Sequence, residues 1–140
     1  MGKVADYVIG VLDEILGGGV EREKRYPWAL GDRSDKTGRQ ARLPFDAVWE
    51  ARRLVVEVDE DQHRRAVTFW DKPDRLTISG VDRRQQRRIY DERKRAAARS
   101  HGYTVVEIEW ERHPPPAKRE RAGDRVRLEA LLQARGINPG

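Results

Sequence analysis

The stretch that decides the fold is FDAVWEARRLVVEVD, residues 45–59. Residues 45–49 and 53–59 alternate in polarity or run β-branched, and a short polar segment separates them. Two such runs joined by a short turn predict an antiparallel hairpin. This hairpin is the element from which the rest of the chain can be interpreted.

The register of the hairpin is expected to bring acidic side chains together. With the turn centred on residues 51 and 52, Asp46 stands opposite Glu57 on the neighbouring strand. Asp59 follows Glu57 by two residues and therefore shares its face. Three carboxylates would thus converge at one end of the hairpin. The other face would pack on helices through Leu54, Val56 and Val58.

The chain before the hairpin divides into a helix and a long connection. Apolar residues recur at helical spacing over residues 3–16, and three glycines then end the pattern. On a helical wheel Glu14 lies at the edge of the apolar stripe, whereas Asp13 points away from it. Residues 20–43 contain Pro27, glycines and many charges, which favours an irregular connection.

The chain after the hairpin predicts a crossover unit. Residues 61–82 are polar and interrupted by proline and glycine, so we expect a partly ordered loop. Residues 83–100 are strong helix formers, and residues 104–110 alternate as a strand. A helix between two strands indicates an α/β domain with a mixed central β-sheet flanked by helices.

The length of 140 residues leaves room for one small domain. We expect a domain over residues 1–112 whose motifs lie within residues 43–110. Residues 113–140 would form a proline-linked basic helix, at roughly 118–135, that packs on the domain or on a partner.

Composition limits the chemistry and the partners. The chain has no cysteine, which excludes disulfides, thiol nucleophiles and cysteine-bound zinc. The net charge of +5 and the 29 basic residues favour nucleic acid over membranes as a partner. The plainer interpretation is a general preference for arginine, largely balanced by 24 acidic residues. The N-terminal segment has an apolar face but also carries Asp6, Asp13 and Glu14, so it is neither a signal peptide nor a membrane span, and a cytoplasmic protein is expected.

Converging acids raise one another's pKa and destabilise a fold unless a cation neutralises them. Oxygen ligands suit Mg²⁺ or Mn²⁺, which polarise phosphoryl groups. The metal would lie at Asp46, Glu57 and Asp59. The alternative is a solvated acidic turn neutralised by neighbouring arginines.

Two further features favour catalysis on a polyanion. His63 follows the acids and could deprotonate an attacking water. The helix predicted over residues 83–100 carries eight basic and two acidic residues, so phosphates could lie along it. A solvated charged helix is the alternative. Its candidate DNA-binding residues include Arg83, Arg84, Arg87 and Arg88.

The ordered motifs resemble a nuclease family. They are LPFD at residues 43–46, VVEVD at 55–59 followed by QH at 62–63, YDERK at 90–94, and GYTVVEI at 102–108. This series resembles the PD-(D/E)XK nuclease superfamily, and in particular the branch of the very short patch repair endonuclease and of homing endonucleases with a Glu, Asp, His, Asp signature. The resemblance implies a restriction-endonuclease-like fold.

The resemblance also implies roles for residues. Asp46 would be the central metal ligand, and Glu57 would occupy the second metal-binding position. His63 would act on water or on the scissile phosphate, and Asp91 would orient it or a hydrated metal. Glu14 is the first-helix acid that we favour, with Glu21 and Glu23 as open alternatives. The residues placed near the DNA backbone are Lys94, Gln86 and Tyr90.

The sequence departs from the family pattern at one important position. The superfamily's lysine two residues after the acid is replaced by Asp59, which makes His63 the favoured base. The sequence therefore predicts an Mg²⁺- or Mn²⁺-dependent DNA endonuclease, acting as a homodimer or as a nicking monomer. The alternative is a DNA-binding module that keeps the nuclease fold but does not cut.

Overall fold

The computed structural model describes residues 2–60, 83–110 and 118–138. This part of the chain is an α/β structure with a four-stranded mixed sheet and three α-helices. In chain order its elements are α1 (Lys3–Leu16), β1 (Glu21–Arg33), β2 (Gln40–Trp49), the 3-10 turn η1 (Glu50–Arg52), β3 (Leu54–Glu60), α3 (Arg83–Ser100), β4 (Thr104–Trp110) and α4 (Lys118–Ala134).

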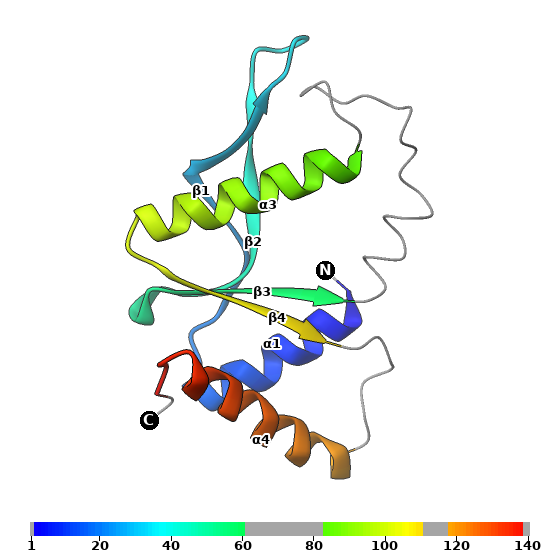
Figure 1. The fold of residues 1–140 in the computed structure, drawn as a ribbon, viewed down its shortest axis with the longest axis vertical. Coiled ribbons are helices and arrows are strands. Elements are labelled where there is room, and N and C mark those ends of the chain that lie inside the picture. The colour runs from blue at the N-terminus through cyan, green and yellow to red at the C-terminus, as the bar shows by residue number, and fades with distance from the viewer. Residues whose placement is uncertain (1, 61–82, 111–117, 139–140) are drawn as a thin grey trace.

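The sheet has the strand order β1-β2-β3-β4. Its first three strands are antiparallel neighbours, and β4 runs parallel to β3 after the crossover that contains α3. The predicted crossover is therefore confirmed. Figure 1 shows α3 on one face of the sheet and α1 with α4 on the other. We call these the α3 face and the α1/α4 face.

The predicted register of the hairpin is confirmed. Ala47 pairs with Val56, and Trp49 pairs with Leu54, around the turn η1. Continuing the same register puts Asp46 beside Glu57. The turn closes with Arg53 in the left-handed region at φ 52°.

The expectation of an irregular connection over residues 20–43 is wrong. Most of this segment forms β1 and the start of β2, which pair in an antiparallel ladder. Pro27 and Gly31 are tolerated because β1 is an edge strand, where a missing N–H or a bulge disrupts little. The ladder register shifts between Arg25 and Leu30 and again between Leu30 and Arg33.

The main core fills the α1/α4 face. Val8 and Leu12 of α1 are fully buried against Val56 of β3. Leu128 and Leu132 of α4 belong to the same cluster and are fully buried. The C-terminal helix therefore packs against the rest of the described chain through these two residues. None of the described helices is long and apolar enough to cross a membrane.

One detail of α1 differs from the helical-wheel prediction. Asp13 does not point away from the core, because its Oδ1 accepts hydrogen bonds from Trp49 Nε1 at 3.0 Å and from the Val20 backbone N–H at 3.1 Å. Glu14 is exposed instead and forms an ion pair with Arg121 of α4. Asp13 thus connects α1 to the end of β2 through a hydrogen bond, and Glu14 connects α1 to α4 through an ion pair.

Candidate active site

Asp46 and Glu57 lie side by side where the β2–β3 ladder ends. The Asp46 backbone N–H donates to Glu57 Oε2 at 3.1 Å, and the Val58 backbone N–H donates to Asp46 Oδ2 at 2.9 Å. Beyond the Ala47–Val56 pair, carboxylates therefore take over as acceptors for backbone N–H groups. These bonds hold both side chains in place on the α3 face, next to each other as the register predicted.

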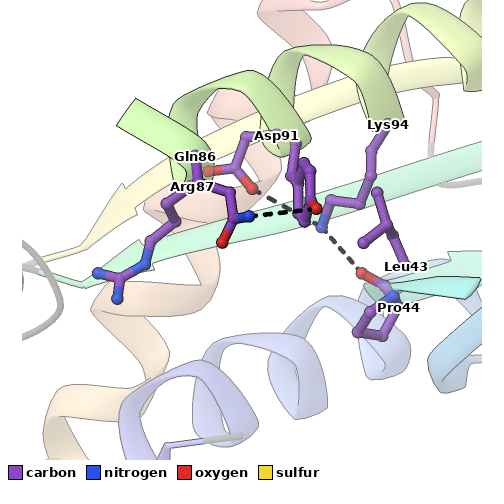
Figure 2. Close-up of a pocket in the computed structure, with 7 residues that line it drawn as sticks. Leu43, Pro44, Gln86, Arg87, Asp91 and Lys94 are labelled. Carbon is purple, nitrogen blue, oxygen red and sulfur yellow. Dashed lines mark hydrogen bonds and ion pairs between the residues drawn. The ribbon is translucent and has the colours of Figure 1, made fainter. Parts of the chain in front are cut away.

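Lys94 of α3 joins the two strands at this point. Its ammonium Nζ lies 2.7 Å from Glu57 Oε1 and donates to the Pro44 backbone carbonyl at 2.8 Å. The same Nζ lies 5.4 Å from the centre of the Phe45 ring. Only 11% of the Lys94 side chain is exposed, so the charge is held with little water around it. Figure 2 shows Lys94 extending from α3 toward Pro44.

The pKa of Glu57 is set by burial and by two neighbouring charges. Burial, and next the negative charge of Asp46, raise the pKa of Glu57 to about 7. Lys94 acts in the opposite direction but does not outweigh them. A carboxyl group whose pKa lies near neutrality in a polar cluster is a frequent mark of a catalytic or ligand-binding position.

One oxygen of this cluster is buried against the Lys94 ammonium. Glu57 Oε1 is buried, and Lys94 Nζ lies 2.7 Å from it. The charge of Lys94 and its hydrogen bond to Glu57 both lower the pKa of this carboxyl, so the ammonium is a partner of this oxygen. Mg²⁺ is a hard cation that uses one or two carboxylates and keeps several waters, so a cation bound here would share Glu57 with Lys94.

An open pocket of about 350 Å³ adjoins the cluster. Lys94 and Asp91 form part of its wall, and Asp91 Oδ1 lies 3.9 Å from Lys94 Nζ. Burial raises the pKa of Asp91, and Asp46 adds to this effect while Lys94 opposes it. The lining residues, drawn in Figure 2, are Leu43, Pro44, Gln86, Arg87, Tyr90, Asp91 and Lys94.

Gln86 and Tyr90 have a structural partner that the sequence did not indicate. The Tyr90 hydroxyl accepts hydrogen bonds from the Asp32 backbone N–H at 3.0 Å and from Gln86 Nε2 at 3.3 Å. Although both residues line the pocket, the Tyr90 hydroxyl joins α3 to β1, and Gln86 donates to that hydroxyl from the same helix. These two residues therefore help to hold α3 against β1. Their position near a DNA backbone stays a prediction.

More acids lie on the α3 face than the hairpin alone predicted. In the β3–β4 ladder Glu57 pairs with Glu107, and Asp59 pairs with Glu109. Registered neighbours share a face, so acids of two strands adjoin. Arg95 of α3 neutralises Glu107, with Nε 2.6 Å from Oε1.

The structure does not bring every predicted site residue to this cluster. Glu14 is on the α1/α4 face, where it contacts Arg121, and Glu21 on β1 pairs with Lys24. Glu23 is exposed on β1. His63 lies outside the described residues.

The acids on the α3 face do not form a metal-binding group of three within the described residues. Within residues 2–60, 83–110 and 118–138, no group of three or more histidine, aspartate or glutamate side chains could hold a metal ion. Asp59 shares the face of Glu57 but is not part of such a group. Of the three predicted metal ligands, Asp46 and Glu57 are the two that the described structure joins directly, through the bond from the Asp46 N–H to Glu57.

Some of the basic side chains of α3 form ion pairs with acids of the sheet, and others are exposed to solvent. Arg93 pairs with Asp32 at 3.0 Å, and Arg95 and Lys94 pair with strand acids, so part of the charge neutralises the sheet. Arg88 and Arg99 are exposed. Arg87 lines the pocket, and the side chains of Arg83 and Arg84 lie outside the described part of the chain.

Sequence reasoning missed the role of Lys94 as the partner of Glu57. Its prediction as a phosphate contact came from a family position, although Lys94 also lies one turn after Asp91 on the helix that crosses the hairpin. That spacing puts both residues on the same helix face and could have suggested that Lys94 lies among the acids of the site.

Comparison with protein-family models, with curated proteins and with solved structures finds no significant match.

Proposed function

We propose that this chain is a metal-dependent DNA endonuclease with a restriction-endonuclease-like fold. The observation that carries the proposal is the cluster of Asp46, Glu57 and Lys94: two carboxylates on adjacent strands and a buried ammonium from the crossover helix, beside an open pocket. The order of the motifs along the chain and the β3–α3–β4 crossover support the same family.

In this proposal Asp46 and Glu57 hold a divalent cation. A bound Mg²⁺ would polarise a phosphoryl oxygen and lower the pKa of a bound water. Glu57 is a ligand only when ionised, and a cation at this position would share its carboxylate with Lys94. Cation binding would therefore strengthen as the pH rises through the region of its pKa, which is about 7.

Lys94 supplies the cationic group that the family motif places two residues after the acid. That position is Asp59 in this chain, but the ammonium reaches Glu57 from α3. From there it can stabilise negative charge on the phosphate or orient the attacking water. In the hydrolysis the water oxygen bonds to phosphorus and the bond to the leaving sugar oxygen breaks. Asp91, on the pocket wall, can accept a hydrogen bond from water, and His63 keeps its proposed role as a base.

Plasmid nicking tests the proposal. Purified protein is incubated with supercoiled plasmid and Mg²⁺ or Mn²⁺, beside Asp46→Asn, Glu57→Gln and the control Glu129→Gln. Glu129 is an acid on α4, where it pairs with Arg125. We expect the first two variants to lose about 100-fold or more of the activity, because each removes a ligand charge, and the control to retain it. Circular dichroism verifies that all variants fold.

The second candidate is a DNA-binding module that does not cut. The contact of Lys94 with Glu57 favours it, because an ammonium already neutralises the acid. DNA binding without nicking under either metal would select this module. Equal nicking by the wild type and by Asp46→Asn would reject the proposed active site.

A further inference from the structure

The strands β1 and β2 continue as a two-stranded ribbon beyond the rest of the sheet. The β2–β3 ladder ends at the Ala47–Val56 pair, whereas the β1–β2 ladder continues to the Arg33–Gln40 pair. Figure 1 shows the end of this ribbon extending past α3. We call residues 31–42 the ribbon arm.

The ribbon arm carries exposed positive charge. Its four basic residues outnumber its two acids, Asp32 and Asp35. Asp32 is occupied by Arg93, with NH1 3.0 Å from Oδ1, which leaves the basic excess uncompensated. All four basic side chains are exposed, and they are Arg33, Lys36, Arg39 and Arg42.

The base of the arm is fixed to α3. The Asp32 backbone N–H donates to the Tyr90 hydroxyl at 3.0 Å, and Arg93 NH1 donates to the Leu30 carbonyl at 3.3 Å as well as to Asp32. Gly31 allows this approach, since a Cβ there would lie 3.3 Å from the Tyr90 ring. Tyr90 also lines the pocket, so the same turns of α3 hold the base of the arm and form part of the pocket wall.

The arm has the dimensions of a groove-binding element. Three residues in each strand, 31–33 and 40–42, span about 10 Å at the rise of a β-strand, and the turn 34–39 extends beyond them. The major groove of B-DNA is about 8.5 Å deep and admits a two-stranded ribbon. The major groove of duplex RNA is deep and narrow and does not admit one. Charge, length and a rigid base therefore favour duplex DNA over RNA.

We propose that the ribbon arm inserts into a groove of duplex DNA, and that its attachment to Tyr90 and Arg93 sets the distance from that groove to the pocket. The inference rests on the proposed function, because it names the element that would position the DNA for cleavage. Lys36 and Arg39 near the tip contact the duplex, whereas Tyr90 and Arg93 position the arm.

Charge reversal on the arm tests the contact. The variant Lys36→Glu/Arg39→Glu is compared with Lys3→Glu/Arg135→Glu, which makes the same change in net charge at exposed positions of α1 and after α4. Binding to a fluorescent 20-base-pair duplex is measured by anisotropy in Ca²⁺, at several salt concentrations. We expect the arm variant to bind about 10-fold or more weakly and its salt slope to fall by about 2, with a small effect in the control. Equal weakening in both variants overturns the inference.

A tethered probe locates the arm on the DNA. Since the chain has no cysteine, Thr37→Cys carries a single thiol at the arm tip, and Ala134→Cys does so at the end of α4. An iron chelate attached to each thiol cleaves nearby DNA through hydroxyl radicals. Cleavage from position 37 and none from position 134 is expected. The same pattern from both positions, or equal competition by duplex RNA of the same sequence, contradicts a groove-bound arm.

The outcomes separate this inference from the proposed function. If the wild type nicks plasmid while the arm variants bind and probe DNA like their controls, the inference fails and the endonuclease stands. If arm variants lose binding but no metal supports nicking, the endonuclease fails and the arm remains the DNA contact of a binding module. A wild-type chain that does not bind duplex DNA rejects the inference.

Discussion

The two faces of the sheet are built from different kinds of residue. The α1/α4 face is covered by aliphatic and tryptophan side chains that come from α1, α4 and the sheet. Leu12, Leu128 and Leu132 are fully buried there. The α3 face has a smaller apolar cluster around Phe45 and Val55, and next to it lie carboxylates held by cations of α3.

This difference separates stability from chemistry. Aliphatic burial contributes stability in proportion to the area removed from water. A buried ion pair contributes little net stability, because desolvation of both groups offsets their attraction. The pair of Glu57 and Lys94 should therefore add little net stability, which agrees with its place in the proposed active site. The α1/α4 face can stabilise the fold while the α3 face holds groups that a stable core would avoid.

The largest expected effect is on the α1/α4 face. Leu12→Ala leaves a cavity in the main cluster and should reduce the free energy of unfolding by about 2–5 kcal/mol. Urea denaturation followed by circular dichroism measures it. Val126→Ala is the control, since Val126 is 66% exposed, and it should change stability by less than about 0.5 kcal/mol. A loss below that level in Leu12→Ala would contradict the assignment of stability to this face.

The next effect is a pH dependence that arises on the α3 face. The pKa of Glu57 is about 7 in the folded state against an ordinary value of 4.5, so between these pH values the folded chain keeps a proton that the unfolded chain releases. The free energy of unfolding should therefore fall as the pH rises through this window, by up to about 3 kcal/mol. The raised pKa of Asp91 acts in the same direction. Urea denaturation in EDTA at several pH values measures the slope.

Two variants assign this slope to the cluster. Glu57→Gln removes the titrating group and should flatten the curve above pH 4.5. Lys94→Met removes the cation that lowers the pKa of Glu57, so the fall should begin at the same pH and extend to higher pH. An unchanged curve in Glu57→Gln would mean that another group causes the pH dependence. It would contradict the assignment of this titration to the α3 face.

A smaller effect is expected where the ribbon arm meets α3. Gly31→Ala brings a methyl group to 3.3 Å from the Tyr90 ring and should cost about 1–3 kcal/mol. The matched change Gly123→Ala, in α4 with open space around the added methyl, should be neutral or stabilising. Thermal unfolding of both variants measures the difference. Equal effects would mean that the arm is not tightly seated.

The smallest effect concerns the outer ion pair of the α3 face. Arg95→Gln removes the partner of Glu107, whose side chain is 47% exposed, and should cost less than about 1 kcal/mol at low salt and less still at high salt. Denaturation at two ionic strengths tests this. A loss comparable to that of Leu12→Ala would show that ion pairs carry more of the stability than proposed.

The elements with strong local patterns could be predicted from the sequence. The hairpin register followed from β-branched alternation around a short turn, and it brought Asp46 to Glu57. Both the first helix and the crossover helix ended where glycines follow them. In each of these segments the local preference agrees with the tertiary structure.

The β1 strand and the partners of α3 could not be predicted in the same way. Proline, glycine and charges obscured β1, although Tyr26, Trp28 and Leu30 alternate as half-buried positions. The contacts of Lys94 with Glu57, and of Tyr90 with Asp32, depend on how α3 crosses the sheet. Such distances between remote segments are fixed by tertiary packing, which residue spacing alone does not define. Likewise, Asp13 and Glu14 exchanged their expected places because Trp49 supplied a donor to Asp13.

The shifted register of β1 also bears on how separate molecules meet. A straight edge strand presents a continuous row of N–H and C=O groups that a second molecule can extend into a fibril. In β1 that row is interrupted by Pro27, which lacks an N–H, and by two shifts on either side of Leu30. Charged side chains such as Arg22 and Arg25 flank it in solvent. This edge is therefore a poor template for strand pairing with a second copy of the chain.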